Sequence, residues 1–162
     1  MKMAGFHLKD KAWLHTLTYT IRGFWEGHEL LGEQRYADIV LGMVEKLHQE
    51  YQATGKLSGI YNHQLVPLAA YRCLTGEAQL AIVLFKIFKN NHQEKWALFG
   101  KQLVRELCNI QPRRDGLLLS GGIAGSSPIY GKYLPFKQLN WATKFFLDAM
   151  LECSHIEINR LY

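Results

Sequence analysis

The chain has 162 residues, of which 48% are hydrophobic and 20% are charged, and these proportions are typical of a single globular domain. Its net charge of +5 is spread over scattered Lys and Arg residues rather than a basic run, so we expect no nucleic-acid partner. No segment is apolar for long enough to be a signal peptide or a membrane span, and the three cysteines lie far apart. We therefore expect a reduced, cytoplasmic protein without a membrane partner, a disulfide framework or a cysteine zinc site.

Five helices are expected from the spacing of apolar residues along the chain. Residues 33–54 and 92–110 each carry one apolar stripe and one charged face, which is typical of outer helices. Residues 11–31, 77–89 and 139–151 lack an ordinary solvated face, as expected of helices surrounded by others. The order along the chain is therefore inner, outer, inner, outer, inner.

The first inner helix has two polar or small faces besides its apolar one. At 100° per residue, one of them consists of small residues that would permit close approach of a neighbouring helix. These residues are Thr16, Thr20, Gly23 and Gly27. The other face carries four chemically active side chains on one stripe, about 16 Å long at helical rise. These are His15, Tyr19, Arg22 and Glu26.

The spacing of the helices indicates a repeat. Inner helices begin near residues 12, 76 and 139, and outer helices near 33 and 92, so a helical hairpin recurs about every 60 residues. The motifs beginning at His15, Cys73, Gly121 and Asn140 resemble the C-terminal half of poorly characterised bacterial toroid proteins associated with polysaccharide gene clusters. These belong to the α/α-toroid superfamily of six-hairpin glycosidases, sugar epimerases and terpenoid cyclases. The resemblance implies one all-α domain over residues 1–162, in which antiparallel hairpins form about half of a toroid.

Half a ring would leave apolar sides of the inner helices exposed. We therefore expect a homodimer, or a separate partner chain, that completes the toroid. An alternative from a different class is a non-catalytic interaction module that pairs with another chain. The sequence does not decide between this module and a ligand-binding protein.

The two long loops, residues 55–74 and 111–137, both lie at the end where the inner helices begin. The positive ends of these helices would converge there and favour an anion, and Arg113, Arg114, Lys132 and Lys137 lie in the second loop. We expect a basin that binds an anionic saccharide beneath this loop, with aromatic rings for stacking. The candidate ligand-binding residues are Gln79, Tyr130, Tyr133, Asn140, Trp141 and Lys144.

The candidate catalytic residues are the polar stripe of the first helix. His15 and Tyr19 could serve as base and acid, and Arg22 could neutralise a substrate carboxylate. A structural alternative is favoured for Arg22 and Glu26, which are spaced for an ion pair, as are Lys144 and Asp148. For His15 the catalytic and structural interpretations remain balanced.

Other chemistries are weakly supported by the sequence. Glycoside hydrolysis needs two facing carboxylates, and of the candidates only Glu77 lies near the basin, where we expect it to serve the first helical turn after a Thr75 cap. The histidines show no metal-ligand spacing, and the glycine-rich stretch 121–126 lacks the ending of a phosphate-binding loop. We therefore expect no metal and no cofactor. No acidic motif of a terpenoid cyclase is present.

Overall fold

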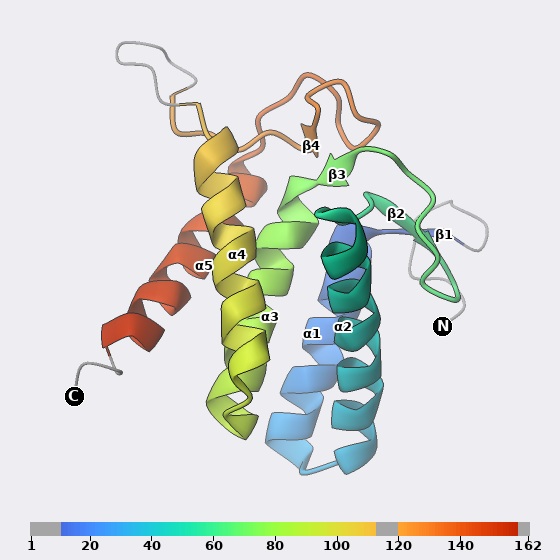
Figure 1. The fold of residues 1–162 in the computed structure, drawn as a ribbon, viewed down its shortest axis with the longest axis vertical. Helices are drawn as coiled ribbons and strands as arrows, with labels where there is room; N and C mark the ends of the chain where they lie inside the picture. Colours follow the sequence, from blue (N-terminus) through green and yellow to red (C-terminus); the bar gives the residue numbers. More distant parts are fainter. Residues whose placement is uncertain (1–10, 113–119, 159–162) are drawn as a thin grey trace.

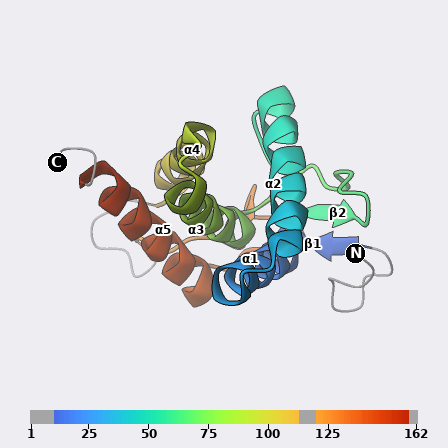
Figure 2. The ribbon, with the colours of Figure 1, turned by 90° about the horizontal axis from the view of Figure 1, so that it is seen from below.

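Five helices form two layers in the computed structural model, which describes residues 11–112 and 120–158. The inner layer consists of α1 (Leu14–Leu31), α3 (Leu74–Asn91) and α5 (Asn140–Ile158), and the outer layer of α2 (Gln34–Thr54) and α4 (Glu94–Ile110) (Figures 1 and 2). The expected alternation of inner and outer helices is confirmed.

The helix α3 is the centre of the fold. It packs against α1, α4 and α5, and every residue from Leu74 to Phe85 is buried. Its lack of a polar face follows directly from this position, because all of its sides meet other helices. The helix expected over residues 77–89 is longer at both ends in the structure, and the helix expected over 139–151 extends to Ile158.

Backbone geometry explains the two tight turns. The helix α1 ends at Gly32 with φ 70°, and α3 ends at His92 with φ 56°, both in the left-handed region. Glycine adopts this conformation without steric strain. Gly32 therefore ends α1, and the chain reverses direction at once into α2. The long loops consequently gather at the opposite end of the bundle, where α1, α3 and α5 begin (Figure 1).

Two short sheets, absent from the sequence prediction, tie the long loops together. The strand β1 (Lys11–Trp13) pairs with β2 (Ile60–Asn62), and β3 (Arg72–Cys73) pairs with β4 (Ser126–Ser127), both antiparallel. Strands of two or three residues are too short for a detectable alternation of apolar and polar residues. Through β3 and β4 the second long loop is fixed to the first.

The close contact between α1 and α3 is not on the small-residue face expected for α1. A Cβ atom at Gly76 of α3 would lie 2.6 Å from Leu14 Cγ and 2.7 Å from the backbone nitrogen of His15. At Gly23, by contrast, a Cβ atom would meet nothing within 4 Å, and at Gly27 it would lie 3.4 Å from Tyr36 of α2. The glycine that lets two inner helices approach is therefore on α3.

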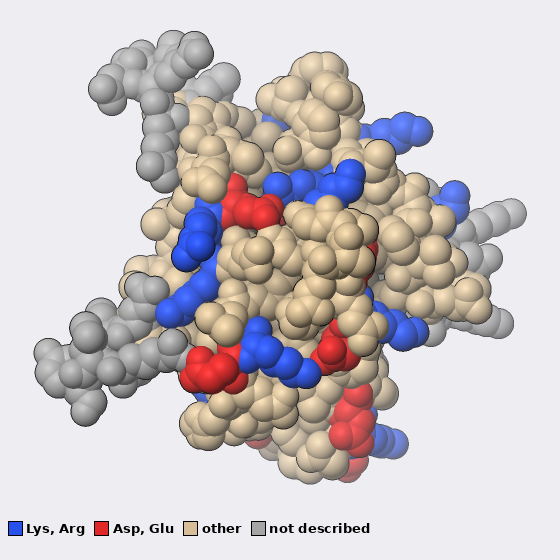
Figure 3. All heavy atoms as spheres, viewed as in Figure 1, with Lys and Arg blue, Asp and Glu red and all other residues tan. Residues whose placement is uncertain are grey.

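The charges are dispersed on the surface. Figure 3 shows Lys and Arg side chains interspersed with Asp and Glu on this face of the molecule, without one large area of a single sign. Ion pairs such as Lys95 with Glu45 and Lys89 with Glu152 link neighbouring helices. Within the described ranges, no helix has the length and apolar composition needed to cross a bilayer.

Candidate functional site

The centre of the candidate site is a hydrogen bond between two inner helices. His15, in the first turn of α1, places Nδ1 2.7 Å from Oε1 of Gln79 on α3. The Thr18 hydroxyl lies 2.8 Å from the same oxygen. Because a carbonyl oxygen only accepts hydrogen bonds, Nδ1 carries the proton and Nε2 of the neutral imidazole keeps a free lone pair.

Burial controls the protonation of this imidazole. It lowers the pKa of His15 below the usual 6.5, while the hydrogen bond to Gln79 opposes the shift. The ring is consequently neutral near pH 7, which is the state required of a general base.

Three aromatic rings surround His15. The ring centroids of Tyr19, Tyr133 and Phe145 lie 4.9, 5.7 and 6.2 Å from that of the imidazole. Tyr19 is exposed and comes from the next turn of α1, whereas Phe145 comes from α5. Residues from α1, from α5 and from the second long loop therefore meet at His15.

The second long loop covers the site through Tyr133. The Ser126 hydroxyl donates to the Tyr133 carbonyl at 2.9 Å and accepts from its backbone nitrogen at 3.1 Å, which holds this ring over His15. Burial raises the pKa of Tyr133 to about 12, and the neighbouring side chains of Trp141 and Thr75 oppose the shift. The loop thus acts as an ordered cover over the starts of the inner helices.

Five of the residues identified from the sequence are therefore brought together around the start of α1. They are His15, Tyr19, Gln79, Tyr133 and Trp141.

The other candidates lie apart from this cluster. Arg22 donates to Glu26 at 2.7 Å, and Lys86 of α3 lies 2.9 Å from the same carboxylate, so the expected ion pair is confirmed and extended by a second cation. The hydrogen bond from Arg22, more than any other interaction, lowers the pKa of Glu26. This ion-paired group sits two to three turns farther along α1 than His15.

The remaining ligand-binding candidates lie at the surface. Lys144 pairs with Asp148, as their spacing indicated, and its ammonium group lies 5.1 Å from the Phe145 ring centre. Asn140 accepts a hydrogen bond from the backbone of Trp141 at the start of α5, and Tyr130 is exposed. Lys132 and Lys137 are also exposed, whereas Arg113 and Arg114 lie outside the described residues.

Sequence reasoning missed two contributors to the cluster. Phe145 lies one turn after Trp141 on α5, and this i, i+4 spacing was a usable signal for a shared face. Thr18 gave no such signal, because its contact with Gln79 depends on how α1 packs against α3.

Glu77 has a different role from the one expected. Its carboxylate is fully buried and receives bidentate hydrogen bonds from Arg72 at 2.8 and 2.5 Å, and Arg72 also lies 2.7 Å from Glu106. Thr75 is not a cap, because α3 begins after Cys73 and the Thr75 hydroxyl has no hydrogen-bond partner. The prediction of a Thr75 cap is therefore wrong. Packing of the long loop onto α3 buries the whole first turn.

Two unpaired polar atoms lie beside the cluster. Gln79 Nε2 and the Thr75 hydroxyl are buried without a hydrogen-bond partner in the described structure. A buried donor without a partner is energetically unfavourable and is a group that a bound polar ligand can satisfy. No group of three or more His, Cys, Asp or Glu suited to a metal ion occurs among the described residues.

Comparison with known proteins identifies the fold. No protein-family model and no characterised protein sequence matches the chain. Among solved structures, it is similar to cellobiose 2-epimerase from Bacillus thermoamylovorans B4167, with a TM-score of 0.67, 9% identity, and coverage of 94% of this chain and 42% of that one.

Two further structures agree with this similarity. An unsaturated glucuronyl hydrolase variant with the saccharide dGlcA-Glc-Rha-Glc has a TM-score of 0.62 and 16% identity, over 90% of this chain and 40% of that chain. A sugar epimerase from a ruminal bacterium has a TM-score of 0.54 and 11% identity, over 89% of this chain and 39% of that chain. The chain spans about two fifths of the length of each. Its five alternating helices are part of an α/α-toroid, the fold that these three proteins share.

Proposed function

We propose that this protein binds an anionic saccharide at the His15 cluster and transfers a proton on it, as part of polysaccharide metabolism. The observation that most directly supports this proposal is the orientation of His15. Its Nδ1 is held by buried Gln79, while its Nε2 remains free among aromatic rings. Sugar rings stack on such aromatic faces. The similarity to sugar epimerases and to a glucuronyl hydrolase supports this ligand class.

The roles within the site follow from the geometry. His15 Nε2 accepts a proton from the sugar, and the hydroxyl of Tyr19, one turn away and exposed, donates one. The unpaired amide of Gln79 and the Trp141 ring bind and orient the ligand. Arg22 and Glu26 hold α1 to α3 through Lys86 instead of contacting the ligand.

The anionic character of the ligand rests on local electrostatics. The helices α1, α3 and α5 all begin at this end, so their positive dipole ends point toward the cluster (Figure 1). Glu77, the carboxylate in the first turn of α3, is paired with Arg72, which it shares with Glu106. Exposed Lys132 and Lys137 lie in the covering loop.

Titration calorimetry with glucuronate, glucose 6-phosphate and glucose tests this proposal. We expect the two anions to bind, and His15→Ala to weaken their binding roughly tenfold, since a buried hydrogen-bonded partner is lost. The matched control His155→Ala removes an exposed histidine of α5 and should bind as the unmodified chain does. If His15→Ala lowers only the melting temperature, or if glucose binds as well as glucuronate, the proposal fails.

A second candidate function is an interaction module that completes a toroid with a second copy or another chain. The exposed side of α5 favours it, because Trp141, Leu147, Met150 and Leu151 are all solvent-exposed there. Light scattering on the purified chain tests it. A stable monomer at micromolar concentration contradicts pairing with a second copy, and a dimer disrupted by Leu147→Glu supports it.

A further inference from the structure

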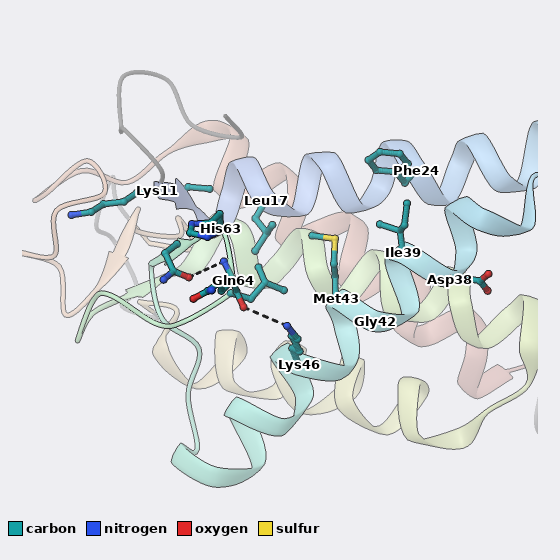
Figure 4. A pocket seen from close by; sticks show the side chains of 13 residues that line it. Lys11, Leu17, Phe24, Asp38, Ile39, Gly42, Met43, Lys46, His63 and Gln64 are labelled. Carbon is teal, nitrogen blue, oxygen red and sulfur yellow. Dashed lines mark hydrogen bonds between the residues drawn. The ribbon is translucent and has the colours of Figure 1, made fainter. Parts of the chain in front are cut away.

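A groove outside the His15 cluster runs between α1, α2 and the turn that follows β2. Its volume is about 600 Å³, within the range of about 300–1,000 Å³ that small-molecule sites occupy. Figure 4 shows the residues that line it from both helices and from the turn. Nothing in the proposed function uses this groove.

The body of the groove is apolar. Leu17 and Phe24 line it from α1, and Ile39 and Met43 from the antiparallel α2 (Figure 4). Leu17 and Phe24 are seven residues apart, so this wall is about 10 Å long at helical rise. The groove stays open because α2 carries Gly42 here, where a Cβ atom would meet nothing within 4 Å.

One end of the groove is basic. Lys46 of α2 and His63 of the turn lie there, and Lys46 Nζ is 3.5 Å from the carbonyl of Gln64, whereas the Lys11 side chain extends away from Lys46 (Figure 4). Within residues 11–112 and 120–158, no carboxylate lies in ion-pair distance of Lys46. An ammonium group at the mouth of an apolar groove favours an anionic group.

The other end has the opposite character. Asp38 lines it, and its carboxylate accepts a hydrogen bond from Gln34 at 2.9 Å. An anionic headgroup is repelled from this end and attracted to Lys46, so the charges fix one orientation along the groove.

We propose that the groove between α1 and α2 binds a medium-chain alkyl carboxylate, with the carboxylate at Lys46 and the chain along Leu17, Met43 and Phe24. The apolar walls shield the chain from water, and the Lys46 ammonium group pairs with the headgroup. The site is independent of the His15 cluster and of any saccharide.

Octanoate is the probe, with octan-1-ol as the neutral ligand of equal chain length and acetate as the headgroup alone. In a ¹H–¹⁵N NMR titration, we expect octanoate to shift the amide signals of Gly42, Met43 and Gln64 saturably. We expect octanol to bind at least about fivefold more weakly, because it forms no charged contact.

Four variants locate the site. Lys46→Ala should weaken octanoate binding about fivefold, whereas Arg105→Ala, which removes an exposed cation from α4, should leave it unchanged. Gly42→Leu places a bulky apolar side chain at the groove, where a Cβ atom has room, and should abolish binding. His15→Ala should have no effect, which separates this inference from the proposed function.

Several results would overturn the inference. Equal affinity for octanoate and octanol removes the role of Lys46, and unchanged binding by Gly42→Leu places the ligand elsewhere. A dimer in light scattering that Gly42→Leu converts to monomer means that a second copy of the chain occupies the groove. Lys46→Ala changes only an exposed side chain, so the test does not depend on how Gly42→Leu folds.

Discussion

The His15 cluster and the groove between α1 and α2 lie on the same helix, yet they are built in opposite ways. The cluster is closed by Tyr133 and packed so tightly that Gly76 touches the backbone of α1. The groove is open, lined by apolar side chains, and holds a glycine that touches nothing. The difference shows that α1 packs closely against α3 at Gly76, whereas unfilled space remains between α1 and α2 at the groove.

Glu77 anchors the closed region and should give the largest effect on stability. Glu77→Ala leaves the mostly buried Arg72 with only Glu106 as a partner, and we expect a loss of about 3 kcal/mol in the free energy of unfolding. Urea denaturation measures this loss. Glu33→Ala, in the exposed pair with Arg35, is the control and should change stability by less than about 1 kcal/mol. Equal losses would mean that the buried pair gives the closed region no special support.

Gly76→Ala tests the tight contact itself. Its new methyl group would overlap Leu14 and the His15 backbone, so we expect destabilisation of roughly 1–3 kcal/mol and a shift of α1. Urea denaturation measures this loss of stability. The NMR signals of His15 should also shift, because the cluster is disturbed. A variant as stable as the original chain would contradict the close packing of α1 on α3.

Gly42→Ala is the matched change in the open region. Alanine has a higher helix propensity than glycine and its methyl group meets no neighbour here, so we expect stabilisation by about 0.5–1 kcal/mol. Thermal unfolding followed by circular dichroism would show a higher melting temperature. Opposite signs at Gly76 and Gly42 would establish the contrast, and destabilisation at both would abolish it.

The titration of His15 should give the smallest effect, because its ring is partly exposed. The pKa of His15 is lowered in the folded state, so below about pH 6.5 the unfolded chain binds more protons than the folded one. The free energy of unfolding therefore decreases as the pH is lowered. His15→Gln should make the decline in melting temperature between pH 7 and pH 5 shallower. His48, whose pKa burial also lowers, remains in both proteins, so an unchanged slope would assign the decline to groups other than His15.

Periodicity predicted the helices well because each is long enough to repeat its pattern several times. The apolar stripe of 33–54 and the uniformly apolar 77–89 correspond to α2 and α3 within a few residues. The ion pair of Arg22 with Glu26 was equally predictable, since it depends only on spacing within one helix. The prediction extended to the part of the site that lies on known helix faces, His15 and Tyr19.

Contacts between separate elements were beyond such reasoning. Arg72 is five residues before Glu77, but it links this carboxylate to Glu106 of α4 because the first long loop folds back as β3. The groove likewise depends on the turn after β2 approaching α2 near Lys46. Neither arrangement leaves a periodic signal, because each joins residues from separate elements.

The sequence by itself determined the helices, their order and their inner or outer position, since burial of a helix face is written in the spacing of its own residues. It also determined the toroid resemblance. The sequence also predicted that the second long loop covers the starts of the inner helices. Only the tertiary structure decided that Tyr133 is the ring of this loop that packs near His15, and that a groove remains open beside α2. The physical reason is that closure and space depend on how separate elements pack, and packing is a property of pairs of surfaces rather than of one segment.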